Sequence, residues 1–120
     1  MSMVVSPSHL RDKFRRMIRR AFKMQLHRGF EEEYKRRHDA LWPELKDLLK
    51  KSGVHDYAIF LDETTNSLFG VMQVEDPALL QNMPEHPVMK KWWAYMRDIM
   101  DTNPDHSPLS VPLKEVFYLP

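Results

Sequence analysis

Hydrophobic residues in this chain switch repeatedly between two spacings, and the order of the switches restricts the folds that the chain can adopt. Alternation at every second position, which is typical of half-buried strands, occurs in four segments: 18–26, 57–61, 68–75 and 113–119. Helical spacing of three to four residues occurs in two longer segments: 30–51 and 88–100. The predicted order is therefore β-α-β-β-α-β, the ferredoxin-like arrangement of an α+β domain.

Glycine and proline residues set the predicted boundaries. Gly29 ends the first strand, and Gly53 stands where a left-handed cap is expected after the first helical segment. Pro43 interrupts that segment, so we expect the helix to kink or restart near Asp39–Trp42. The polar sequence DETTNS joins the second and third strands and predicts an antiparallel hairpin, and a short helix is expected over Asp76–Asn82.

The two faces of the predicted sheet both carry apolar side chains. One face lies under the helices and receives the apolar positions of the first strand: Ile18, Phe22, Met24 and Leu26. The opposite face also has apolar candidates: Phe60, Phe69, Val71 and Val116. An apolar face of this size needs a cover, and a second copy of the chain can supply one through a symmetric contact. We therefore predict a homodimer with its sheets face to face, a dimeric α/β barrel.

Length and composition exclude several classes of protein. A chain of 120 residues has the size of one domain and can bury a core without a metal or disulfide. The absence of cysteine excludes disulfides and thiolate chemistry and fits a cytoplasmic location. The sequence contains no run of 18 apolar residues, the length that a membrane-spanning helix needs. The sequence has no phosphate-binding glycine loop and no HExxH motif, and its histidines are scattered, so we do not expect a metal ion.

The N-terminus differs in charge from the rest of the chain. Residues 11–20 hold six basic residues and one acidic residue, whereas the remainder is net acidic. A basic segment can bind nucleic acid, but this one lacks the interleaved aromatic side chains on which bases stack. We expect neither nucleic acid nor a membrane as a partner. We interpret residues 1–16 as an N-terminal extension of a domain that covers 17–120.

The residues best able to carry chemistry are aromatic and include one histidine. Tyr34 and His38 lie four apart on the inner side of the first helical segment. Their spacing alone favours a histidine hydrogen-bonded at the edge of the core; the alternative is a proton-transfer residue facing a cavity. Trp92 and Trp93 point about 100° apart on a helix, so one can pack in the core while the other lines a rim suited to a sugar face; the alternative is plain core and interface packing. Tyr57 can direct its hydroxyl into the same space.

Five blocks of sequence together resemble one enzyme family, the L-rhamnose mutarotases. The blocks are EEYKRRHDALWPEL (32–45), HDYAIFLD (55–62), KWWAYMRDIM (91–100), NPDHSP (103–108) and EVFYLP (115–120). The similarity runs in order over residues 17–120, and Met17 lies where the family's chain is expected to start. The resemblance implies a dimeric isomerase that interconverts the α and β anomers of L-rhamnose without a cofactor. It places the family's acid on His38 and its sugar-binding positions on Tyr34, Tyr57, Trp92 and Trp93.

The implied reaction needs an acid and a base. Mutarotation protonates the ring oxygen, removes the proton of the anomeric hydroxyl and opens the ring to an aldehyde, which recloses on its other face. His38 would be the general acid towards the ring oxygen, and the base stays open between a carboxylate such as Asp56 and a bound water. Two other functions fit the same scaffold: a cofactor-free monooxygenase-like enzyme, and a non-enzymatic binding protein whose aromatic residues form its core.

Overall fold

The computed structural model describes residues 17–120, and the extension predicted over 1–16 lies outside the described residues. The described part of the chain forms these strands: β1 (Ile18–Gln25), β2 (Val54–Asp62), β3 (Ser67–Val74) and β4 (Val111–Leu113). Its helices are α2 (Glu31–Asp39), α3 (Pro43–Lys51) and α4 (Pro87–Met96), with short 3₁₀ turns η1 (Pro77–Leu80) and η2 (Met83–Glu85) between β3 and α4.

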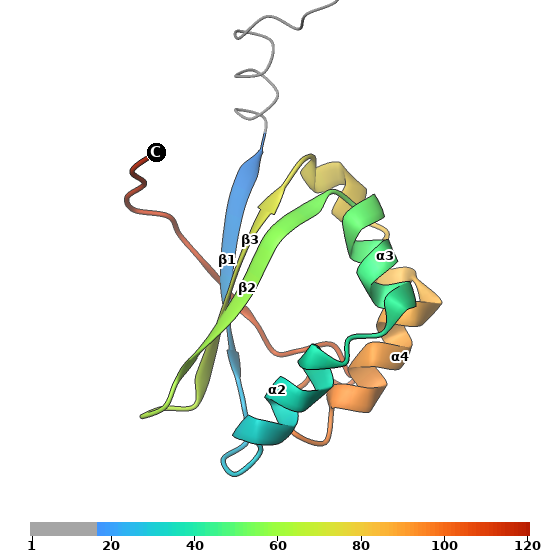
Figure 1. The fold of residues 1–120 in the computed structure, drawn as a ribbon, viewed down its shortest axis with the longest axis vertical. Coiled ribbons are helices and arrows are strands. Elements are labelled where there is room, and N and C mark those ends of the chain that lie inside the picture. The colour runs from blue at the N-terminus through green and yellow to red at the C-terminus, as the bar shows by residue number, and fades with distance from the viewer. Residues whose placement is uncertain (1–16) are drawn as a thin grey trace, which may run out of the picture.

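The strands form one antiparallel sheet in the order β2-β3-β1-β4. β1 lies between β3 and β4, so the first strand of the sequence pairs with strands that follow much later. The helices α2, α3 and α4 all lie on the same side of the sheet (Figure 1). This arrangement confirms the predicted α+β, ferredoxin-like fold. We call the sheet face towards the helices the inner face and the opposite one the outer face.

Local sequence explains how the helices begin and end. The predicted first helix restarts: Trp42 is extended at ψ 133°, and Pro43 occupies the first turn of α3, where its missing N–H is not needed. Gly53 follows α3 with φ 82° and donates its N–H to the carbonyl of Lys50. At the start of α4, the side chain of His86 accepts the N–H of Val88, 3.2 Å away.

The last helix is shorter than the sequence predicts. The spacing indicated a helix up to Met100, but α4 ends at Met96. Ile99 is fully buried in the turn that follows, and Met100 forms an isolated bridge with Leu26 of the first strand region. The helical spacing continues past the helix because these two residues still belong to the core, although the backbone has left the helix.

A bulge in β2 sets which side chains face inward. His55 pairs with Gln73 and Ala58 with Val71, so two residues, Asp56 and Tyr57, lie opposite one residue of β3. Asp56 adopts the left-handed conformation, with φ 49°. Because side chains alternate between faces, the extra residue lets positions on both sides of the bulge share the inner face: Val54, Tyr57, Ile59 and Leu61.

The predicted last strand is wrong over most of its length. The strand β4 spans Val111–Leu113, where it pairs with Ala21–Lys23 of β1, and 114–120 are not in a strand. The alternation of 113–119 predicted two faces, but it could not show whether a neighbouring strand continues alongside. The C-terminal tail (residues 114–120) instead runs to the side of the sheet away from the helices (Figure 1).

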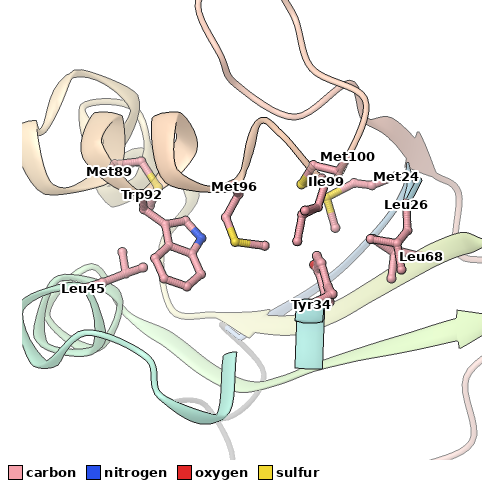
Figure 2. Close-up of a cluster of buried hydrophobic side chains, with 10 residues drawn as sticks. All are labelled: Met24, Leu26, Tyr34, Leu45, Leu68, Met89, Trp92, Met96, Ile99 and Met100. Atoms are coloured by element: carbon pink, nitrogen blue, oxygen red, sulfur yellow. The ribbon is translucent and has the colours of Figure 1, made fainter. Parts of the chain in front are cut away.

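The core lies between the inner face and the helices (Figure 2). It comprises these buried residues: Met24, Leu26, Tyr34, Leu45, Leu68, Met89, Trp92, Met96, Ile99 and Met100. Tyr34 projects from α2 into this cluster, and Trp92 faces it from α4 (Figure 2). Within the described residues, no helix has the length and apolar character needed to cross a membrane.

Candidate active site

A large cavity opens between the inner face of the sheet and the helices. Its volume is about 1250 Å³, and it is lined by residues of β1, β2, β3, α2, α3 and α4 and by the loop that follows α4. All five residues that the sequence analysis proposed for a site line it: Tyr34, His38, Tyr57, Trp92 and Trp93. A smaller hollow of about 410 Å³ beside Gly29 is lined by three glutamates together with Gly29, Leu61 and Asn66, and has no aromatic side chain or histidine.

His38 lies in the last turn of α2 and is held in a defined tautomer. Its Nδ1 lies 3.0 Å from the backbone carbonyl of Tyr34, one turn earlier. A carbonyl oxygen only accepts, so Nδ1 carries the proton and the neutral ring has its lone pair on Nε2. Burial lowers the pKa of His38 below its ordinary value, and the hydrogen bond to Tyr34 opposes this only in part. At neutral pH His38 is therefore an uncharged proton acceptor.

Two tyrosines lie in the same cavity. Tyr34 is buried and stacks on the His38 ring, with centroids 4.3 Å apart. Burial raises the pKa of Tyr57 to about 12, yet 39% of this residue is accessible to water. Both facts hold because Tyr57 lines a cavity: protein surrounds the side chain while the cavity itself admits solvent. Burial raises the pKa of Tyr34 as well, and the nearby Tyr57 adds to the shift. Both phenols stay protonated at neutral pH and can donate hydrogen bonds.

The backbone of β3 leaves room for the ring that supports Tyr57. Gly70 faces the Phe22 ring so closely that a Cβ at this position would collide with it. Phe22 in turn meets Tyr57 edge to face, with centroids 6.1 Å apart. The β2 bulge directs Tyr57 inward, and the ring of Phe22 packs against the Tyr57 ring and supports it.

The wall opposite the sheet is aromatic. Trp92 is buried and meets the His38 ring edge to face at 5.3 Å. Trp42, just before α3, packs against both Trp92 and Tyr95 at 5.1 and 5.5 Å. Trp93 is partly buried beside this cluster. The sequence analysis named Trp42 only at the expected break of the first helical segment, and it did not select Tyr95, because an aromatic residue inside a helix has no distinctive local pattern.

An arginine that the sequence analysis missed fixes α2 against α4. The Arg37 side chain, only 10% exposed, contacts Glu33 at 2.7 Å and Asp98 at 2.9 Å and donates to the carbonyl of Tyr95 at 2.7 Å. The hydrogen bonds that the Arg37 guanidinium donates to Asp98 hold the pKa of this carboxyl below its usual range. Only the i, i+4 spacing of Glu33 and Arg37 could have signalled the clamp. It holds the helix that carries His38 beside the helix that carries Trp92.

The site has no arrangement suited to a metal. Among residues 17–120, no group of three or more histidine, aspartate or glutamate side chains is placed to hold a metal ion. The loop after α4 contributes polar cavity residues that the sequence analysis did not select, among them Asn103, His106 and Ser107. Asp56, the carboxylate considered as a base, also lines the cavity.

The fold and the site define an α+β protein of the ferredoxin-like class whose aromatic cavity combines the neutral imidazole of His38 with phenol donors. A family model described as L-rhamnose mutarotase matches residues 19–119. An L-rhamnose mutarotase of Rhizobium johnstonii is 60% identical over 100 residues, 83% of this chain and 94% of the relative. One of Brucella anthropi is 59% identical over 102 residues, 85% of this chain and 96% of the relative.

A solved structure agrees with the sequence relatives. The crystal structure of an L-rhamnose mutarotase from Formosa agariphila superimposes with a TM-score of 0.80 at 51% identity, covering 86% of this chain and 99% of that one. The chain belongs to the L-rhamnose mutarotase family. This membership supports a sugar isomerase over the monooxygenase-like and non-enzymatic alternatives.

Proposed function

We propose that this protein interconverts the α and β anomers of L-rhamnose and that His38 is the residue that moves the proton. The observation that carries the proposal is the tautomer of His38: its Nδ1 is occupied by the Tyr34 carbonyl, which leaves an unprotonated Nε2 for the cavity. The substrate itself comes from the names of the relatives, all of which are L-rhamnose mutarotases.

Ring opening requires one proton to leave O1 and one to reach the ring oxygen. Both oxygens are bonded to C1, so a single imidazole can serve them in turn. Nε2 of His38 accepts the O1 proton, C1 and O1 form the carbonyl, and the bond from C1 to the ring oxygen breaks. The same imidazolium then gives its proton to the ring oxygen, the acid role assigned from the family resemblance. Rotation about C1–C2 and the reverse steps yield the other anomer, with no net gain or loss of protons.

The aromatic side chains orient the sugar. Trp92 and Trp93 present apolar surface to the C–H face of the ring and to the 6-deoxy methyl group, and the hydroxyls of Tyr34 and Tyr57 donate hydrogen bonds to sugar oxygens. A neutral His38 is compatible with this aromatic surround because no charge is buried before the reaction begins.

The test is the rate of anomer exchange. L-rhamnose at equilibrium is observed by saturation-transfer NMR, in which irradiation of one anomeric proton lowers the signal of the other in proportion to the exchange rate. Added protein is expected to increase this transfer in proportion to its concentration, and heat-denatured protein serves as the control. Equal transfer with native protein and with buffer would exclude the function.

We also propose that the active form is a homodimer joined through the outer face. Phe60 on β2 is 62% exposed and Val71 on β3 lies exposed beside it on the same face. The C-terminal tail adds Val116, 88% exposed, and is fixed by Arg19, which contacts Glu115 at 2.6 Å and lies 3.2 Å over the Tyr118 ring. A second sheet and tail would remove this apolar surface from water. We also propose that the protein is cytoplasmic, a location that fits its lack of cysteine.

Sedimentation equilibrium tests the dimer. The unaltered chain should give twice the monomer mass, and Phe60→Glu, which would place a charge at the centre of the contact, should give monomers. The matched control is Glu85→Gln, because Glu85 lies exposed in η2 on the helix side. A monomeric mass for the unaltered chain at tens of micromolar would refute the proposed contact.

A further inference from the structure

The loop that follows α4 forms part of the cavity wall and is held by hydrogen bonds at both ends. The backbone N–H of Asp101 donates to the carbonyl of Gln25 at 3.0 Å, and Leu109 donates to the carbonyl of Asp101 at 3.1 Å. The Asp101 carboxylate also lies 2.9 Å from Nε2 of His27. Both ends of the loop, residues 101–109, are thereby tied to one another and to β1.

The tip of this loop holds His106 in an unusual conformation. The N–H of Asn103 donates to the carbonyl of Ser107 at 2.7 Å, and the N–H of His106 donates to the carbonyl of Asn103 at 2.9 Å. His106 has φ 74°, in the left-handed region that few residues with a side chain adopt. Such strain persists where the surrounding structure imposes it, and it concentrates at functional sites.

The imidazole of His106 is also fixed in one tautomer. Nη1 of Arg97 lies 2.8 Å from Nε2 of His106. A guanidinium only donates, so Nε2 accepts and the ring proton lies on Nδ1. Within residues 17–120, no hydrogen bond from Nδ1 is formed. His106 therefore offers an unused N–H donor, and the residue lines the cavity that His38 also lines.

The two cavity histidines are complementary. His38 has its proton on Nδ1 and presents an acceptor, whereas His106 has its proton on Nδ1 because Arg97 occupies Nε2, and it presents that proton as a donor. A sugar brings hydroxyl groups that need both kinds of partner. O1 and the ring oxygen are served by His38, so the donor of His106 is available to a hydroxyl that does not react.

We propose that His106 is a substrate-binding residue whose Nδ1–H donates a hydrogen bond to a non-reacting hydroxyl of the bound sugar. The inference rests on the proposed mutarotase function and adds a specificity contact to the same cavity. Because the contact is made equally before and during ring opening, its loss raises KM and leaves kcat nearly constant.

A pair of substitutions separates the effect of losing the N–H donor from the effect of disturbing the strained backbone at position 106. Glycine and asparagine both tolerate a positive φ, so His106→Gly and His106→Asn should retain the loop, but only asparagine keeps a side-chain N–H. Anomer-exchange rates measured over a range of L-rhamnose concentrations should show KM raised about three- to tenfold by His106→Gly, the range of one neutral hydrogen bond, and less by His106→Asn. Equal KM values for the two variants, or a loss confined to kcat, would overturn the proposal.

A spectroscopic measurement on the unaltered chain tests the proposed hydrogen bond without any substitution. Long-range ¹⁵N–¹H correlation of the histidine rings should show the proton of His106 on Nδ1, and the Nδ1 resonance should shift as L-rhamnose is added. A proton on Nε2, or no shift at saturating sugar, would refute the contact. Failure of the function itself would look different, since the unaltered chain would then leave anomer exchange at its rate in buffer.

Discussion

The inner and outer faces of the sheet carry similar apolar side chains but are completed in different ways. On the inner face, Leu61 and Leu68 pair across β2 and β3 and pack beneath the helices. On the outer face, Phe60 of β2 pairs with Phe69 of β3, and no helix of residues 17–120 covers them. Within residues 17–120 the helices therefore cover one face, and the other is the face on which we propose that a second copy of the chain packs. Properties of the inner face should be independent of protein concentration, whereas those of the outer face should depend on it.

The largest expected effect lies on the inner face. His38→Gln keeps a side chain of similar reach but cannot transfer a proton, so kcat for anomer exchange should fall by roughly 10²–10⁴-fold. His55→Gln is the matched control, because His55 is half-exposed on the outer face, paired with Glu75 at 3.4 Å, and should change kcat by less than about twofold. A His38→Gln enzyme within about tenfold of the unaltered chain would assign the proton transfer to another group.

A pair of alanine substitutions compares the two faces directly. Leu68→Ala removes a fully buried side chain and should lower the free energy of unfolding by about 2–5 kcal/mol at any protein concentration. Phe60→Ala should have a smaller effect that shrinks further on dilution, because it weakens only the contact with a partner. Urea unfolding at two protein concentrations, a hundredfold apart, measures both. The same loss for Phe60→Ala at both concentrations would mean that Phe60 stabilises the monomer.

The sequence predicted the inner face better than the outer one. Alternation placed Phe22, Met24 and Leu26 together, and the structure packs all three at the core. Such patterns work when the chain itself supplies the cover. The tail failed as a strand because alternation in 113–119 records two faces but not whether a neighbouring strand is present to pair with.

The candidate site was predictable in its residues but not in its chemistry. Helical spacing brought Tyr34 and His38 together, the side-chain chemistry of Trp92, Trp93 and Tyr57 singled out these three, and the family resemblance pointed to the same residues. The tautomer of His38 depends on a backbone carbonyl, and the inward direction of Tyr57 depends on a bulge at Asp56; neither leaves a sequence pattern. His106 was passed over because its donor depends on Arg97, nine residues earlier in the chain at the C-terminal end of α4.

The next prediction, with a smaller expected effect, is the pH dependence of catalysis by His38 on the inner face. Burial lowers the pKa of His38, and the neutral form is the one that accepts the O1 proton. Activity should therefore be flat above about pH 6.5, the ordinary histidine value, and fall about tenfold per pH unit only below the lowered pKa. The residual activity of His38→Gln should lack this acidic limb. A decline of kcat/KM as the pH rises through 6 would show that the protonated form enters the reaction.

The smallest expected effect tests whether the bulge on the inner face supplies chemistry or only geometry. Asp56→Asn removes the carboxylate but keeps a residue that tolerates φ 49°, so Tyr57 should stay directed into the cavity. If His38 moves the proton in both steps, kcat should change by less than about threefold. Asp56→Val is the contrast, because a β-branched residue is strained at this φ and should disturb the bulge and the position of Tyr57. A hundredfold loss in Asp56→Asn, with stability retained, would make Asp56 the base and confine His38 to the acid role.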